Sequence, residues 1–265
     1  MNLYIDFGGT NFKYCLDDGD VKTVPSNNVD ILKFIDDMIL AGNCIENIAI
    51  SFAGQVKNGI ILSAPNINLQ NLDIKNYVFE KYKINLLIEN DLNCAAAYEY
   101  SKYDVDSVAV FYVGTGFGSA FVVNGKILSG YSNLSGEIGH IPFKKMDKNC
   151  PCGRDDCLEL SVSGKALNDK KLQDCDEITI QRFKDGLKHA FFTVLNLLDP
   201  DVFVLGGSVI THNMWLVDFL KEEYKNSSFF EIRNDLQIFV SDSKYGNIEG
   251  LKILLKDKNA KISNI

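Results

Sequence analysis

The apolar residues of this chain fall into short continuous runs and into longer stretches with helical spacing, a pattern typical of a mixed α/β protein. The longest helical stretch covers 178–198 and ends at Asp199-Pro200. The apolar runs predict strands at 3–7, 12–16, 47–52, 86–89, 108–113, 119–123, 202–205 and 237–240, with one more beginning at Val21. The spacing predicts helices at 28–40, 92–103, 178–198, 214–224 and 248–255.

One pattern, a strand followed by a glycine turn and a second strand, occurs twice. The first copy contains Gly8 to Gly19 and the second contains Gly114 to Gly125, with the same spacing in both. We interpret the two copies as an internal repeat, in which two lobes each open with a β-meander. A chance match between two strand–glycine–strand units is the alternative.

Composition agrees with a compact protein. The chain has 265 residues, of which 46% are hydrophobic and 23% are charged. At this length folding buries about 70–75% of the surface of the extended chain, so the core needs no disulfides. The net charge is −8 and no block of Lys or Arg stands out, which argues against nucleic acid as the main partner. A nucleotide remains compatible, because backbone N–H groups and a metal ion can hold it.

The cysteines change this picture more than the composition does. No apolar run is long enough to span a bilayer and the N-terminus lacks a basic region, so we expect a cytoplasmic protein with no membrane partner. In a reducing compartment the seven cysteines are not expected to form disulfides. Three of them, Cys150, Cys152 and Cys157, crowd together, which indicates a metal site.

Three glycine turns each follow an apolar strand. The first, 8–10, comes after Asp6, the second covers 114–118 and the third covers 206–208. Glycines let the backbone approach an anion closely and direct N–H groups at it, and a carboxylate at a strand end can hold a metal-bound water. A tight turn also favours glycine, so each turn alone has a purely structural reading. Their repetition after apolar strands favours phosphate binding.

An acidic residue, Asp91, stands between an expected strand and an expected helix. This places it at the carboxyl edge of a sheet, where α/β proteins bind ligands. A carboxylate there could take a proton from an alcohol as a general base. Asp91 is also a plausible N-cap for the helix beginning at Leu92, and the residues alone favour the cap.

The strongest local signal combines His140 with the three clustered cysteines. One histidine and three cysteines form a closed tetrahedral ligand set for zinc. Three buried free thiols are the alternative, but polar and charged residues surround these positions. A structural zinc would hold Glu137 and Glu159 beside the imidazole, and two carboxylates with an imidazole could recognise a polyhydroxyl ligand.

Taken together, these motifs resemble the ROK family of sugar kinases and repressors, within the actin/hexokinase/Hsp70-like ATPase superfamily. The resemblance covers most of the chain and is carried by Asp6-Phe7-Gly8-Gly9-Thr10, 89–97, 114–118, 136–140, 150–159, Gly206-Gly207 and 246–255. It implies an α/β, two-lobed actin-like ATPase (ribonuclease H-like) fold, with duplicated βββαβαβα units and an inserted zinc loop. A smaller lobe would contain 1–107 and the C-terminal helix 248–265, and a larger lobe with the zinc-binding loop would contain 108–247.

The resemblance also implies an activity, namely transfer of the γ-phosphoryl group of ATP to a hydroxyl of a hexose or N-acetylhexosamine, most directly O6 of glucose. The enzyme would be a phosphotransferase with an alcohol acceptor, of glucokinase type, with Asp91 as general base and with ATP, Mg²⁺ and a structural Zn²⁺. The residues implied to bind the sugar are Asn66, Asn90, Glu137, His140 and Glu159. Those implied to face ATP and Mg²⁺ are Asp6, Gly8, Gly9, Thr10, Gly114, Thr115, Gly116, Gly118, Gly206 and Gly207. Those implied to hold zinc are His140, Cys150, Cys152 and Cys157.

Some features leave alternatives open. The chain has Ala53 where the family usually has proline, and Ser119 where glycine is common in the family. Repressors of the family carry an N-terminal helix-turn-helix, for which the position of Asp6 in the first strand leaves no room, so we expect no DNA binding. A non-catalytic sugar-binding regulatory protein of the same fold is the main alternative to a kinase. His189 and His212 are read as structural or surface residues, and the identity of the sugar and the oligomeric state, with a homodimer as one option, stay open.

Overall fold

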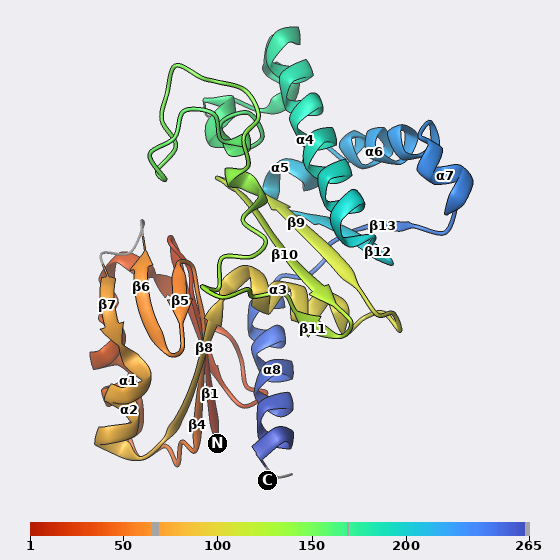
Figure 1. Cartoon of the computed structure of the whole chain (residues 1–265). Coiled ribbons are helices and arrows are strands. Elements are labelled where there is room, and N and C mark those ends of the chain that lie inside the picture. Colours follow the sequence, from red (N-terminus) through yellow and green to blue (C-terminus); the bar gives the residue numbers. More distant parts are fainter. Residues whose placement is uncertain (65–68, 169, 263–265) are drawn as a thin grey trace. The chain divides into compact units, whose positions relative to one another are not determined.

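The computed structural model of the chain describes residues 1–64, 69–168 and 170–262, and it divides into two compact units (Figure 1). The first unit contains 1–98, 130–134 and 244–265, and the second contains 99–129 and 135–243. These units divide the chain at 98/99 and 243/244, whereas the lobes expected from the resemblance divide it at 107/108 and 247/248. The segment 130–134 packs with the first unit although its neighbours in the chain belong to the second.

A five-stranded sheet forms the centre of the first unit, with the strand order β3-β2-β1-β4-β8. Strand β1 is antiparallel to β2 and parallel to β4, and β4 is parallel to β8. The strands of this sheet are β1 (Asn2–Phe7), β2 (Asn11–Leu16), β3 (Lys22–Pro25), β4 (Asn47–Phe52) and β8 (Asn85–Asn90). The helices of the unit are α1 (Ile31–Leu40), α2 (Ile74–Tyr82), most of α3 (Asp91–Tyr100) and α8 (Gly246–Ile262).

The two faces of this sheet are buried by different helices. Leu3, Ile5 and Phe7 are fully buried and pack in one cluster with residues of α1 and α2. Because neighbouring side chains of a strand point to opposite faces, Tyr4 and Asp6 lie on the other face. There Tyr4 packs with residues of α8. Figure 1 shows α8 running along the sheet on the side away from α1 and α2.

The second unit repeats the arrangement. Its sheet has the order β11-β10-β9-β12-β13. In both units the first strand of the sheet lies in the middle, with the second and third strands on one side of it and the fourth and fifth on the other. The strands are β9 (Val108–Val113), β10 (Phe117–Val123), β11 (Lys126–Ile127), β12 (Val202–Gly206) and β13 (Gln237–Val240). The helices are α4 (Glu177–Leu198), α5 (Ser208–Thr211), α6 (Trp215–Lys225) and α7 (Ser228–Ile232). The shared strand order confirms the predicted internal repeat, and the segment with the clustered cysteines is inserted between β11 and α4.

The chain returns to its first unit at the end. Helix α8 follows β13 of the second unit, yet Ile248, Leu251 and Leu255 pack against the sheet of the first unit. Gly250 permits a very close contact with α3, because a Cβ there would overlap the carbonyl oxygen of Cys94. Only glycine fits where the backbones of two helices come this near.

Several boundaries differ from the sequence-based prediction for local reasons. The helix expected at 28–40 begins at Ile31, because the Asp30 carboxylate accepts hydrogen bonds from the first free N–H groups of α1. A three-stranded sheet that the sequence did not predict is inserted before α2, with the order β5 (Gln55–Lys57), β6 (Ile60–Ala64) and β7 (Leu69–Asp73). Among the helices of the described residues, none is both long and apolar enough to cross a bilayer.

Candidate functional site

Three polar side chains stand in register where the parallel strands of the first unit end. Asp6 of β1 is paired with Ser51 of β4, and Ser51 is paired with Glu89 of β8. Ligands of open α/β sheets bind at this carboxyl edge. The strand-end carboxylate and the segment carrying Asp91, which are distant in sequence, therefore lie at the same edge of one sheet.

The carboxylate of Asp6 is buried, and each of its oxygens has a partner. Its Oδ1 accepts hydrogen bonds from Ser51 Oγ at 3.1 Å and from Asn247 Nδ2 at 3.0 Å. Its Oδ2 forms an ion pair with Lys13 Nζ at 3.1 Å, across the β1–β2 pair. A buried charge needs such a partner. Asp6 is thus a fixed negative charge beside a cationic side chain that the sequence analysis did not single out.

The first glycine turn connects β1 to β2 and is closed by hydrogen bonds. Gly8 N–H donates to Asn11 O at 3.0 Å, and Ser26 Oγ donates to Gly8 O at 2.6 Å. Gly9 and Thr10 lie exposed at its tip. The turn therefore presents the two residues that the sequence analysis assigned to phosphate.

Asp91 is the first residue of α3, and the residue before it caps the helix. The Oδ1 of Asn90 accepts from Leu92 N–H at 2.9 Å and from Asn93 N–H at 3.4 Å. The expectation that Asp91 is the N-cap is wrong, because α3 begins at Asp91 and Asn90 stands at the cap position. The Oδ1 of Asp91 also accepts from Leu92 N–H, at 3.0 Å. The Nδ2 of Asn90 donates to Gly54 O at 3.2 Å, so both ends of this predicted sugar ligand bond the backbone.

In the second unit the side chains of His140, Cys150, Cys152 and Cys157 converge as their spacing predicts. Their donor atoms all lie within 4.8 Å of one another. The Nδ1 of His140 is 3.3 Å from Cys150 Sγ, and Cys152 Sγ is 3.3 Å from Cys157 Sγ. A tetrahedral zinc with bonds of about 2.0–2.3 Å separates its ligand atoms by about 3.3–3.8 Å. The donor set fits a closed zinc site, and the ion itself stays a prediction.

The pKa values of these three thiols shift in different directions. Burial raises the pKa of the Cys150 thiol, and its hydrogen bond to Glu159 raises it further. Burial likewise raises the pKa of Cys157. A hydrogen bond from the backbone at Arg154 lowers the pKa of the exposed Cys152. Because metals bind the thiolate, a positive charge at the centre of the cluster would ionise the two buried thiols.

The predicted sugar-binding carboxylates lie beside the same imidazole. His140 Nε2 is 3.9 Å from Glu137 Oε2, so this nitrogen faces away from the thiols. Glu159 Oε1 accepts a hydrogen bond from Cys150 Sγ at 2.9 Å. A Cβ on Gly116 would lie 3.4 Å from Glu159 Oε2, so Glu159 also borders the second glycine turn. Asn66, the remaining predicted sugar ligand, lies outside the described residues.

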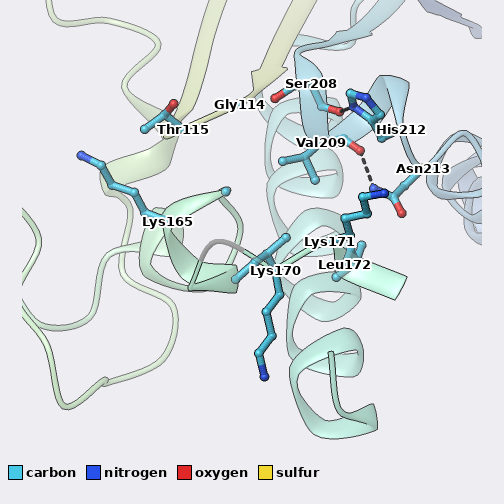
Figure 2. Close-up of a pocket in the computed structure, with 12 residues that line it drawn as sticks. Gly114, Thr115, Lys165, Lys170, Lys171, Leu172, Ser208, Val209, His212 and Asn213 are labelled. Atoms are coloured by element: carbon cyan, nitrogen blue, oxygen red, sulfur yellow. Dashed lines mark hydrogen bonds between the residues drawn. The ribbon is translucent and has the colours of Figure 1, made fainter. Parts of the chain in front are cut away.

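The second and third glycine turns share a pocket of about 340 Å³ in the second unit (Figure 2). Gly114 and Thr115 come from the turn after β9, and Ser208 comes from the first turn of α5. Three lysines, Lys165, Lys170 and Lys171, also line this pocket, and no glycine motif in the sequence signals them. Its described lining residues include no acidic side chain and are Gly114, Thr115, Gly164, Lys165, Leu167, Lys170, Lys171, Leu172, Ser208, Val209, His212 and Asn213. His212, read from the sequence as structural or surface, is exposed and lines the pocket.

The wall of this pocket depends on Gly207. Its φ is +87° and its ψ is 159°, a conformation that essentially only glycine adopts, and a Cβ there would overlap the carbonyl of Val113. We expect Gly207→Ala to lower the free energy of unfolding by about 3 kcal/mol or more, from backbone strain plus overlap. Urea denaturation measures this loss. Gly42→Ala is the control, because Gly42 has φ +83° and nothing within 4 Å, so strain alone should remain at about 1 kcal/mol. Equal losses in the two variants would contradict the overlap.

Comparison with known proteins gives consistent results. The model of the ROK family matches residues 3–252. N-acetylmannosamine kinase of Escherichia coli is 28% identical over 79% of this chain and 83% of its own length. The xylose repressor of Bacillus subtilis is 27% identical over 70% of this chain, which spans only 54% of that repressor. The solved structure of a ROK family glucokinase from Streptomyces griseus, in complex with glucose and AMPPNP, has a TM-score of 0.74 at 21% identity, covering 96% of this chain and 98% of that one.

Proposed function

The chain belongs to the ROK family, and from this premise we propose that it is a kinase that transfers the γ-phosphoryl group of ATP to a hydroxyl of a hexose or N-acetylhexosamine. The relatives include both kinases and repressors, so membership alone does not select the activity. The proposed acceptor is O6 of glucose, by analogy with the solved glucokinase of the same fold.

The observation that carries this proposal is the pocket shared by the second and third glycine turns. Phosphoryl transfer depends on positioning and on stabilising the charge of the phosphates, which N–H groups and cationic side chains provide. The pocket combines a glycine turn and Thr115 with Lys165, Lys170 and Lys171. Leu167, Leu172 and Val209 add apolar surface suited to a nucleoside. A protein that only senses a sugar would have no use for a pocket of this chemistry.

The first unit would supply the chemistry at the acceptor. We assign Asp91 as the base that takes the proton of the sugar hydroxyl, at the carboxyl edge that also carries Asp6. The carboxylate of Asp6 would hold Mg²⁺ through water, and the turn 8–10 would face the phosphates. When bound, Mg²⁺ neutralises charge on the phosphate oxygens. Burial and the neighbouring Ser51 keep Asp6 oriented for this role.

The second unit would supply sugar recognition. Glu137, His140 and Glu159 are assigned to sugar hydroxyls, together with Asn90 and Asn66. The three cysteines and Nδ1 of His140 would hold a structural zinc, which leaves Nε2 of His140 for a ligand. The pKa of Glu137 is raised, mainly by burial. The nearby Glu159 adds to this rise, and His140 opposes it.

A sugar-binding regulatory protein without catalysis is the second candidate. It is favoured by the similarity to the xylose repressor over 70% of this chain. Such a protein would keep the sugar-binding carboxylates but would not need a base at the position of Asp91. The two functions therefore differ in turnover and not in sugar affinity.

A panel of hexoses and N-acetylhexosamines tests the choice. The purified chain is mixed with ATP, Mg²⁺ and each sugar, and release of ADP is followed in a coupled assay, with sugar binding measured in parallel by calorimetry. We expect ADP release well above the sugar-free rate with at least one sugar, at a kcat of about 1–100 s⁻¹. Saturable sugar binding with no ADP release would overturn the kinase in favour of the regulatory protein.

A further inference from the structure

The segment 130–134, which we call the strap, leaves the second unit and packs in the first. Asn133 is its principal anchor. The Nδ2 of Asn133 donates one hydrogen bond to Val56 O at 2.9 Å and another to Glu89 Oε1 at 3.0 Å. The φ of Asn133 is +58°, a left-handed conformation that asparagine tolerates better than most residues. A second contact of the strap is exposed to solvent, where Lys57 Nζ lies 4.1 Å from the ring centre of Tyr131.

The acceptor of that bond, Glu89, organises the start of α3. Its Oε1 accepts from Asn90 N–H at 2.8 Å and from Asn93 Nδ2 at 2.9 Å, in addition to Asn133. Three donors on one carboxylate oxygen form charge-assisted bonds, which are stronger than neutral ones. Asn90 in turn caps α3 through its own side chain. Asp91 is the next residue after Asn90, so Glu89 fixes the geometry of the turn that leads into Asp91.

We propose that Asn133 is a positioning residue for the general base, because it fixes Glu89 and thereby the turn that carries Asp91. The inference rests on the proposed kinase function. Loss of the Asn133 amide removes one of the three donors on Glu89 and frees the strap from Val56. The carboxylate can then rotate toward water, and the Asn90–Asp91 turn loses its restraint. A displacement of about 1 Å at a reacting group can cost about 100-fold in rate.

The experiment compares two glycine substitutions in the first unit. Asn133→Gly removes the amide but keeps the left-handed backbone available. Asn58→Gly is the matched control, since Asn58 also has a positive φ, of 53°, but lies exposed between β5 and β6. We expect Asn133→Gly to lower kcat by about 10–100-fold with the sugar KM within about threefold, and Asn58→Gly to change neither. Asn133→Asp, which sets a like charge beside Glu89, should lower kcat at least as much.

Hydrogen exchange gives a readout that does not need activity. The amides of residues 90–93 should exchange faster in Asn133→Gly than in the wild type, and at the wild-type rate in Asn58→Gly. An unchanged kcat in Asn133→Gly, whether or not KM rises, would overturn the positioning role. If the wild type itself releases no ADP with any sugar, the kinase assignment fails. Hydrogen exchange then decides whether Asn133 orders the turn, and unchanged exchange overturns that as well.

Discussion

Replacing Asp91 by asparagine is expected to lower kcat by about 10²–10⁴-fold, because a carboxamide cannot take the proton of the sugar hydroxyl. Sugar affinity should stay within about threefold, since asparagine has nearly the same size and can still accept hydrogen bonds. The fold should also tolerate the change, because Asn90 and not Asp91 supplies the main cap of α3. ADP release measures the rate, and calorimetry measures the binding of the sugar.

The control for this variant is Asp73→Asn. Asp73 caps α2 in the same unit, where its Oδ1 accepts from Asn76 N–H at 3.0 Å, and it lies exposed. The substitution makes the same chemical change away from the sheet edge, and asparagine is an equally good cap. Activity of Asp73→Asn should match the wild type. A near wild-type rate in folded Asp91→Asn would remove Asp91 from the role of base.

Replacing Cys152 by alanine is expected to release the bound metal and to weaken sugar binding by about 10–100-fold. Cys152 is the exposed thiol of the cluster, so its loss removes a ligand with little loss of packing. The remaining His140, Cys150 and Cys157 offer three of the four ligands of a closed zinc site. Without the ion, His140 would lose the bond through Nδ1 that orients its Nε2 for a ligand. Elemental analysis should show about one zinc per wild-type chain and almost none in the variant.

Cys44→Ala serves as the matched control for the metal. Cys44 is an exposed thiol in the first unit and lies outside the Cys/His cluster. Its loss should change neither the zinc content nor the affinity for sugar. Full sugar affinity in Cys152→Ala without zinc would show that the ion does not hold the recognition residues, even if the cluster binds it.

The apolar patterns predicted the central strands of the two sheets, β1, β4, β9 and β12, because nearly all of their residues are buried. The strand expected at 237–240 has those bounds in the structure, and the helix expected at 178–198 differs by one residue. The small inserted sheet was not predicted because β5 has only three residues and β7 has no buried residue, although β6 is apolar and buries two of its five residues. Helix α2 was not predicted either, because only Ile74 and Val78 of its residues are buried and the apolar pattern is weak.

The candidate site was predictable where its residues are close in sequence. The glycine turns and the cysteine cluster are local motifs whose chemistry can be read directly. The lysines of the pocket and the bond between Asn133 and Glu89 are not local, because folding alone brings these residues together. The choice between Asn90 and Asp91 as the cap depends on which residue stands just before the helical backbone, and the residue types leave that open.

The return of α8 to the first unit has a consequence for biosynthesis. During translation, residues 1–98 leave the ribosome long before helix α8 (Gly246–Ile262) is synthesised. Until then, one face of the sheet of the first unit is not covered by α8. That face includes Tyr4, Cys15 and Ala49, which pack with residues of α8 in the complete chain. We infer that the second unit can complete its core before the first unit does. The N-terminal part of the nascent chain would then need protection by a chaperone for the longest time. Shortening the chain before Ile248 should therefore cause aggregation through the sheet that begins the protein.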